Sequence, residues 1–206
     1  MTERDTFGER RQTQEDEYFR KREQELIQKM RQRAETDAAR RQLAEQSGIA
    51  DTEVLQDLEA LGYTPDTVRL LHLVPLVQMA WAEGGVSDRE RSLILDAARA
   101  GSIDDGSAAA HQLAQWLATR PTDQFFETTL RAIGALLAGQ PAAERDAAQR
   151  DLLAHCTAIA AASGGILGRG KVSDTERQLL RHISRELETR RGTTASGSHT
   201  APEDES

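Results

Sequence analysis

The chain of 206 residues contains one cysteine, Cys156, and few aromatic residues, which make up 4% of it. A single cysteine excludes an internal disulfide framework and a multi-cysteine zinc site. The scarcity of aromatic side chains argues against a base-stacking platform for nucleic acids. An excess of basic residues is also lacking, because 26 Lys and Arg stand against 34 Asp and Glu, for a formal net charge of -8. These counts predict a protein of a reducing compartment that does not bind nucleic acid.

Long apolar segments are missing as well. No apolar run approaches the roughly 20 residues that a membrane-spanning helix needs. The first residues, MTERDTFGERRQ, lack the apolar stretch of a signal peptide. We therefore expect a cytoplasmic protein that does not insert into membranes.

Residues 1–46 form a highly charged segment, with 11 Lys and Arg and 11 Asp and Glu. No Gly or Pro occurs between Gln12 and Gln46, and Glu, Gln, Arg, Lys and Ala dominate, which favours one continuous helix. The apolar stripe of this helix is narrow and ends well before Leu43. Its members are Phe19, Leu26, Ile27 and Met30. Such a helix cannot bury enough surface to fold alone, so we expect a solvated arm suited to a partner's groove.

Glycine, proline and serine divide the rest of the chain into segments with helical periodicity. Phe126, Leu130 and Ile133 show the spacing most clearly, and no segment alternates as a strand would. The segment around Pro75 is apolar on nearly every face, so we expect a central buried helix that this proline kinks or splits. The expected helices span residues 51–62, 66–81, 87–100, 107–118, 126–137, 142–163 and 173–190.

Two stretches of the chain resemble each other. Each has a glycine pair followed by Val-Ser-Asp-x-Glu-Arg, and the two serines, Ser87 and Ser173, lie 86 residues apart. The repeat predicts an all-α, pseudo-symmetric bundle of about seven helices, preceded by the long charged helix. The expected division is a helical arm over 1–46, an all-α domain over 47–191 and a disordered acidic tail over 192–206.

The repeated turns allow two interpretations. Ser87 with Glu90, and Ser173 with Glu176, have the spacing of capping boxes, in which serine and glutamate each bind the other's backbone amide. Alternatively, Glu83 and Glu90 could bind Ca²⁺ or Mg²⁺, because these cations prefer oxygen ligands. The second repeat lacks the first of these carboxylates, so two symmetric metal sites are not expected.

Other motifs do not combine into an active site. Residues 165–171 have the spacing of a phosphate loop, but Val172 replaces the Ser or Thr and no strand precedes it. His155 and Cys156 are neighbours on a helix and point about 100° apart, and Cys156 fits the core stripe. The other histidines within the helices show no ligand spacing: His72, His111 and His182. We therefore expect that the protein is not an enzyme.

Around the first turn, residues 75–91 read PLVQMAWAEGGVSDRER. This string resembles the hallmark turn of the TerB-like, tellurite-resistance-associated family, where an Ala-rich helix ends in Asp-Gly before a helix that opens with Glu. By helix order the resemblance covers residues 50–188, with Glu83 in place of the family's Asp and an insertion at 166–171. It implies an all-α cytoplasmic protein of stress responses with a suspected acidic metal site.

The arm carries a second resemblance. Phe7-Gly8, Arg10, Glu15, Glu17-Tyr-Phe-Arg20 and Glu25 resemble the inhibitory segment of the mitochondrial ATPase inhibitor family. That family presents a charged helix that wedges into a catalytic interface of F1-ATPase and blocks hydrolysis. Its histidine-rich continuation is absent, since no histidine precedes His72. With the apolar stripe, the resemblance implies a partner-binding surface made of Phe7, Arg10, Glu15, Tyr18, Phe19, Arg20, Glu25, Ile27 and Met30.

The sequence thus predicts a non-enzymatic, cytoplasmic, stress-associated regulatory protein. A TerB-like domain is joined to a partner-binding helix, with F1-ATPase as the candidate partner. The alternative is a sensor of stress, of the tellurite type, that binds a divalent cation, Ca²⁺ or Mg²⁺. In that case the N-terminal helix is only a linker or scaffold.

Overall fold

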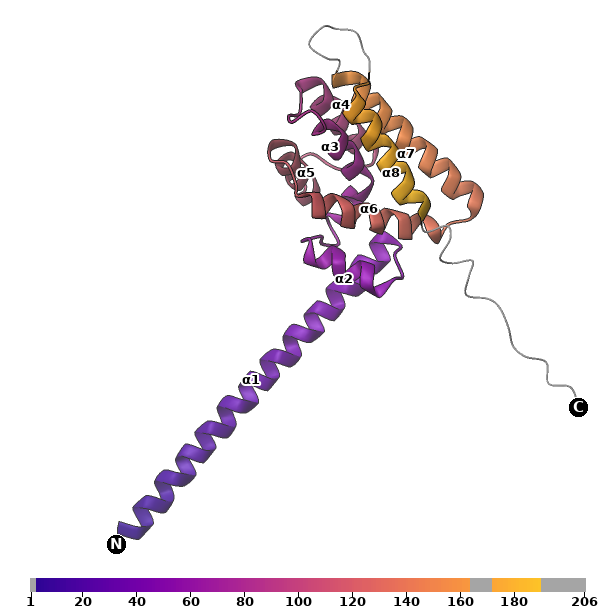
Figure 1. The fold of residues 1–206 in the computed structure, drawn as a ribbon. Helices are drawn as coiled ribbons and strands as arrows, with labels where there is room; N and C mark the ends of the chain where they lie inside the picture. Colours follow the sequence, from indigo (N-terminus) through magenta and orange to yellow (C-terminus); the bar gives the residue numbers. More distant parts are fainter. Residues whose placement is uncertain (1–2, 164–171, 190–206) are drawn as a thin grey trace, which may run out of the picture. The chain divides into compact units, whose positions relative to one another are not determined.

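A computed structural model of the chain describes the backbone of residues 3–163 and 172–189, and the side chains of 18–162 and 172–188. This part of the chain contains eight α helices, one 3₁₀ helix and no strand, which confirms the predicted all-α class (Figure 1). The predicted tail, 192–206, and the phosphate-loop-like insertion lie outside the described residues. The chain divides into two compact units, Met1–Arg41 and Gln42–Ser206, which are described separately.

The first unit consists of most of α1 (Glu3–Ser47), a single helix of 45 residues. Its run of strong helix formers without Pro explains why it continues unbroken. Between Tyr18 and Arg41 no side chain is buried, whereas Leu43 is only 1% exposed. The last turn of α1 therefore lies in the second unit, although the sequence placed it in the arm.

Besides the last turn of α1, the described part of the second unit contains seven α helices and the 3₁₀ helix, and about seven helices were predicted. In chain order they are α2 (Thr52–Ala60), η1 (Val68–Leu73), α3 (Val74–Ala80), α4 (Asp88–Ala100), α5 (Ala108–Ala118), α6 (Asp123–Ala138), α7 (Ala142–Ser163) and α8 (Asp174–Thr189). Pro75 lies in the first turn of α3, so the apolar central segment is split into η1 and α3, one of the two outcomes expected of this proline.

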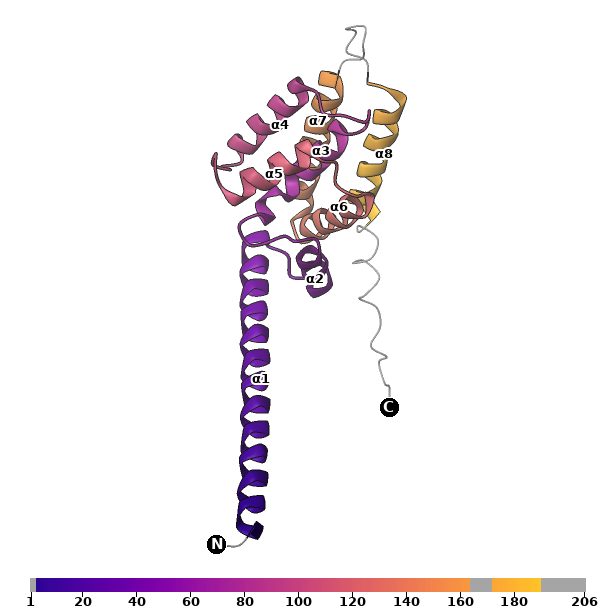
Figure 2. The ribbon, with the colours of Figure 1, turned by 90° about the vertical axis from the view of Figure 1, so that its left-hand side faces the viewer.

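α3 is the centre of the second unit. Six of its seven residues are buried, and it contacts α4, α6, α7 and α8. α7 and α8 lie side by side in both views, and α4 contacts α7 next to α3 (Figure 2). The three helices α3, α4 and α7, with η1, line the cavity described below.

Helix boundaries follow local signals in the sequence. Side-chain oxygens accept hydrogen bonds from backbone amides at the starts of α2, α4, α5 and α6. The residues that cap these helices are Asp51, Ser87, Ser107 and Thr122. After α2 and α3 the chain turns at Gly62 and Gly84, whose φ angles of 84° and 88° suit glycine. Gly62 lies at the expected end of the helix predicted over 51–62, and Gly84 follows the helix predicted over 66–81.

An aromatic cluster fills the core between α2, α5 and α6. The Tyr63 ring stacks on Phe125 at a centroid distance of 5.8 Å, and Trp116 lies 5.0 Å from Phe125. The Tyr63 hydroxyl is within 3.2 Å of Thr129 Oγ1, and burial raises the pKa of this tyrosine. Trp81 joins the cluster by donating from Nε1 to the Trp116 carbonyl at 2.9 Å. We refer to these residues as the aromatic cluster.

Candidate functional site

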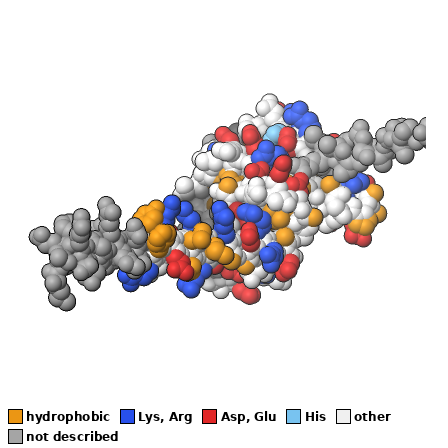
Figure 3. All heavy atoms as spheres, turned by 90° about the horizontal axis from the view of Figure 1, so that it is seen from below, with side chains coloured by type: hydrophobic (Ala, Val, Ile, Leu, Met, Phe, Trp, Pro, Cys, Tyr) orange, Lys and Arg blue, Asp and Glu red, His pale blue; other side chains and the backbone are white. Residues whose placement is uncertain are grey.

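Exposed hydrophobic side chains concentrate on α1. Among the described residues, six large hydrophobic side chains are exposed, and only Leu93 of these lies outside α1. The other five, which we call the arm surface, are Tyr18, Phe19, Leu26, Ile27 and Met30. Figure 3 shows one face of the molecule, on which hydrophobic side chains lie among those of Lys and Arg.

The arm surface has a defined geometry. At 3.6 residues per turn, Phe19, Leu26 and Met30 lie on one stripe, about 16 Å long, with Tyr18 and Ile27 on either side of it. The Tyr18 and Phe19 rings meet edge to face at a centroid distance of 6.0 Å. The Arg22 guanidinium lies 5.9 Å from the centre of the Tyr18 ring. A stripe of this kind can enter an apolar groove of another protein.

The charged residues predicted to accompany the stripe are only partly described. The side chains of Arg20 and Glu25 are exposed on α1. The side chains of Phe7, Arg10 and Glu15 lie outside the described residues, although the backbone there is helical. The binding role of all nine predicted residues stays a prediction.

At the start of α4, Ser87 and Glu90 form a complete capping box. Ser87 Oγ accepts from the Glu90 amide at 3.3 Å, and Glu90 Oε2 accepts from the Ser87 amide at 2.8 Å. The Ser87 hydroxyl also donates to Glu90 Oε2 at 2.7 Å. At the start of α8, Ser173 Oγ accepts from the Glu176 amide at 3.2 Å, and Glu176 Oε2 accepts from the Ser173 amide at 2.6 Å. Both predicted boxes are therefore present.

The two carboxylates of the predicted cation site have different surroundings. Glu83 is exposed, whereas Glu90 is 2% exposed and its Oε2 accepts two hydrogen bonds from Ser87. In the part of the chain that the structure describes, no three His, Cys, Asp or Glu side chains gather as a metal site requires. Binding of Ca²⁺ or Mg²⁺ at this turn stays a prediction.

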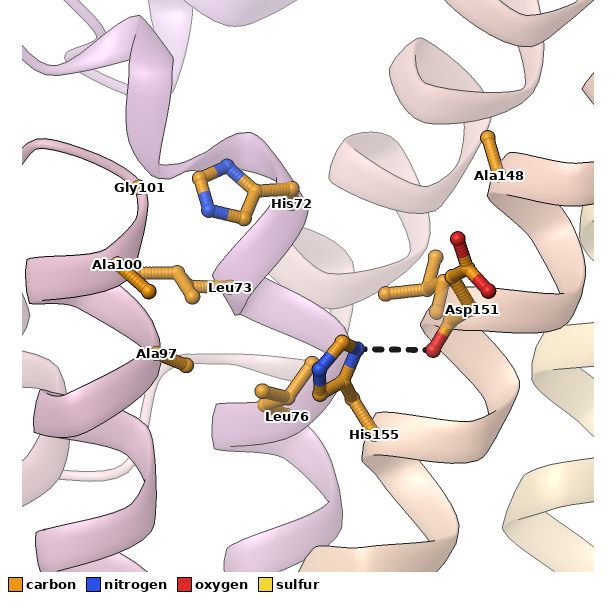
Figure 4. Close-up of a pocket in the computed structure, with 10 residues that line it drawn as sticks. His72, Leu73, Leu76, Ala97, Ala100, Gly101, Ala148, Asp151 and His155 are labelled. Carbon is orange, nitrogen blue, oxygen red and sulfur yellow. Dashed lines mark hydrogen bonds between the residues drawn. The ribbon is translucent and has the colours of Figure 1, made fainter. Parts of the chain in front are cut away.

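A cavity of about 280 Å³ lies between η1, α3, α4 and α7. Its apolar lining consists of Leu73, Leu76, Ala97, Ala100, Gly101, Ala148 and Leu152, and its polar lining of His72, Asp151 and His155. We call it the His pocket. Figure 4 shows the His72 ring pointing from η1 toward Gly101 and the His155 ring pointing from α7 toward Leu76.

The histidines of the His pocket each have a ring N–H directed at the backbone. His155 Nδ1 lies 2.9 Å from the Asp151 carbonyl, which can only accept, so Nδ1 donates. Burial lowers the pKa of His72 below its usual value of 6.5. Hydrogen bonding with the Arg69 backbone opposes this shift in part, and the Coulombic effect of His155 adds to it. His72 is therefore mainly neutral at pH 7.

A second cavity, of about 310 Å³, is lined by residues of α3, α6 and α8 and by the segments that flank α3 and α6. Its lining includes Gln78, Arg120, Asp123, Glu127 and His182. Gln78 Oε1 is buried and accepts no hydrogen bond within the described chain. Arg120 pairs with Asp123, so the charges of this cavity are partly balanced.

The His pocket was missed by sequence reasoning. His72 and His155 lie far apart in the chain, so no local spacing relates them, but η1 and α7 bring both to one cavity. The one local signal was the spacing of Asp151 and His155, which are four residues apart and hence neighbours on a helix. Cys156, next in the chain, is fully buried as predicted, and burial raises the pKa of its thiol to about 12.

The described chain contains no helix long and apolar enough to cross a membrane. Comparison of the chain with models of known protein families, with curated proteins and with solved structures gives no match.

Proposed function

We propose that the protein is a non-enzymatic, cytoplasmic regulatory protein whose arm surface binds another protein. The observation that carries the proposal is the concentration of exposed hydrophobic side chains on one segment of α1. Scattered single hydrophobic residues are normal on protein surfaces, but adjacent ones mark interaction sites. Here five of them occur within residues 18–30.

The composition of the arm surface supports a protein partner. Aromatic residues, Met and Arg are enriched in protein interfaces, and all three occur in this segment. Phe19, Leu26 and Met30 supply an apolar stripe, while Arg20 and Glu25 supply charges at its edges. Helices with this pattern bind by laying the stripe into a groove, as calmodulin targets do.

The candidate partner is the F1 part of an ATP synthase, on the strength of the resemblance of residues 7–25 to the ATPase inhibitor family. By the same reasoning, the resemblance of residues 75–91 to the TerB-like family supports a role in stress responses. In this proposal the helical domain supports the arm and is not itself the inhibitory element.

The test is ATP hydrolysis by soluble F1 in the presence of the full chain. We expect the wild type to suppress hydrolysis and the double variant Tyr18→Ala, Phe19→Ala to suppress it much less. Loss of an aromatic anchor typically costs about 2 kcal/mol or more of binding free energy. Leu93→Ala is the matched control, because it removes the exposed hydrophobic side chain that lies outside the arm.

Two results would contradict the proposal in different ways. If the wild type leaves hydrolysis unchanged well above micromolar concentrations, F1 is not the partner. If residues 42–206 alone suppress hydrolysis as well as the full chain does, the arm surface is not the binding element.

A further inference from the structure

The charges within the arm surface form a basic block followed directly by an acidic block. Residues 20–22 are Arg-Lys-Arg, and residues 23–25 are Glu-Gln-Glu. All six side chains are exposed on α1, which runs unbroken through this segment (Figure 1). The boundary between the blocks, between Arg22 and Glu23, lies within the hydrophobic segment 18–30. A second copy of the helix that runs in the opposite direction therefore brings unlike charges together.

An antiparallel pair of arms with a two-fold axis at this boundary has a defined register. Phe19 and Leu26 are equally far from the boundary, so each lies level with the other in the second copy. The basic block lies level with the acidic block, twice by symmetry. In a parallel pair in register, each block would instead lie level with a block of the same charge. Charge complementarity therefore favours the antiparallel arrangement.

The two sides of the apolar stripe are complementary as well. At about 100° per residue, Arg20 and Glu23 lie on one side of the stripe. Arg22 and Glu25 lie on the other side. A two-fold axis that relates two antiparallel helices brings equivalent sides together. Each Arg20 therefore faces Glu23 of the second copy, and each Arg22 faces Glu25 of the second copy. Opposite charges thus flank the apolar contact on both sides.

We infer that the arm surface binds a second copy of this chain as an antiparallel helix pair, with Phe19 and Leu26 at its centre. The hydrophobic segment 18–30 is only about 18 Å long, so the interface is small and the association is weak and reversible. The inference goes beyond the proposed function and does not depend on F1. Because the pair covers the arm surface, it has to separate before another protein can bind there.

The test is sedimentation equilibrium of the full-length protein, without F1, between about 1 and 500 µM. We expect the average mass to rise from that of a monomer toward that of a dimer as the concentration increases. The double variant Phe19→Ala, Leu26→Ala should abolish this rise, because it removes the apolar centre of the pair. Leu93→Ala removes an exposed hydrophobic side chain outside the arm and should leave the rise unchanged.

Charge variants test the register. Arg22→Glu and Glu25→Arg should each raise the dissociation constant of the pair about tenfold, because two attractive contacts become repulsive. An equimolar mixture of the two variants should associate at least as tightly as the wild type, since opposite charges face each other again between unlike chains. Lys21→Glu is the matched control, because Lys21 lies on the face of α1 opposite the stripe and makes no contact in the pair.

Spin labels measure the orientation of the two helices. Cys156 is buried, so a nitroxide reacts with a cysteine introduced at an exposed position of the arm. Along the pair, labels at Ala34→Cys should be about 35 Å apart and labels at Gln24→Cys only about 5 Å apart. A parallel pair in register would show no such displacement at either position.

Three results would overturn the inference. The first is a protein that stays monomeric at every concentration. The second is a mixture of the two charge variants that associates no better than either variant alone, or a Lys21→Glu variant that weakens the pair as much as Arg22→Glu does. The third is a label distance at Ala34 that is no longer than the distance at Gln24. A failure of F1 inhibition would leave all of these measurements unchanged.

Discussion

Replacement of Glu90 by alanine distinguishes a capping role from a cation-binding role. Glu90 Oε2 accepts hydrogen bonds from the Ser87 amide and hydroxyl at 2.8 and 2.7 Å. A hydrogen bond to a charged group contributes about 1.5–3 kcal/mol. Since Ser87 is exposed, water can replace Glu90 as the partner of its amide and hydroxyl, so each hydrogen bond contributes near the lower end of this range. We expect Glu90→Ala to lower the free energy of unfolding by about 2–3 kcal/mol without any cation present.

Ser87→Ala should cost less than Glu90→Ala. It removes the side chain that caps the Glu90 amide, a loss of about 1 kcal/mol, but keeps the bond from the residue 87 amide to Glu90. Ser107→Ala is a suitable comparison, because Ser107 caps α5 through the Ala110 amide at 3.1 Å. The double variant at Ser87 and Glu90 should cost less than the sum, since the two side chains share a hydrogen bond.

The assay is urea unfolding followed by far-UV circular dichroism, with and without millimolar Ca²⁺ or Mg²⁺. An unchanged slope with urea would show that the variants alter stability and not the extent of unfolding. If Glu90→Ala costs less than about 0.5 kcal/mol, the capping argument is refuted. If, in addition, the cation raises the melting temperature of the wild type and Glu83→Gln removes that increase, the cation hypothesis is correct.

Three further predictions follow from burial. Cys156 is fully buried with a pKa raised to about 12, so iodoacetamide should modify it only after the protein is unfolded in urea. Because the pKa of His72 is lowered in the folded state, the unfolded state binds more protons below pH 6.5, and the free energy of unfolding decreases as the pH falls. His72→Gln should make this decrease smaller when the free energy of unfolding is measured with urea at several pH values. An unchanged decrease would contradict the lowered pKa of His72. Leu43→Ala should cost about 2–5 kcal/mol of unfolding free energy, whereas Leu26→Ala, at an exposed position of the same helix, should cost less than about 0.5 kcal/mol.

Local signals made most of the fold predictable. Capping serines, glycines at helix ends and a proline in the first turn act within a few residues, so their effect can be seen in the sequence. This is why the starts of α4 and α8, the end of α3 at Ala80 and the split at Pro75 lie within a few residues of their expected places. The all-α class followed from the helical spacing of apolar residues, as in Phe126, Leu130 and Ile133.

Long-range contacts explain what was not predictable. Leu43 continues a polar helix without any change in local composition, and only its packing in the core assigns it to the second unit. The His pocket depends on how η1, α4 and α7 come together, and the alanines that leave its space look like ordinary helix formers in the sequence. The arm surface, in contrast, could be predicted, because its hydrophobic residues all lie on one helix and their exposure does not depend on contacts between distant parts of the chain.

The aromatic cluster determines what fluorescence can report. The chain has two tryptophans, and both Trp81 and Trp116 belong to this cluster, whereas the aromatic residues of the arm surface are Tyr18 and Phe19. Tryptophan emission therefore follows unfolding of the helical domain and is not expected to report events confined to the arm surface. A partner that contacts only the arm would be visible through tyrosine, or through a tryptophan introduced at Phe19, against an unchanged signal from the domain.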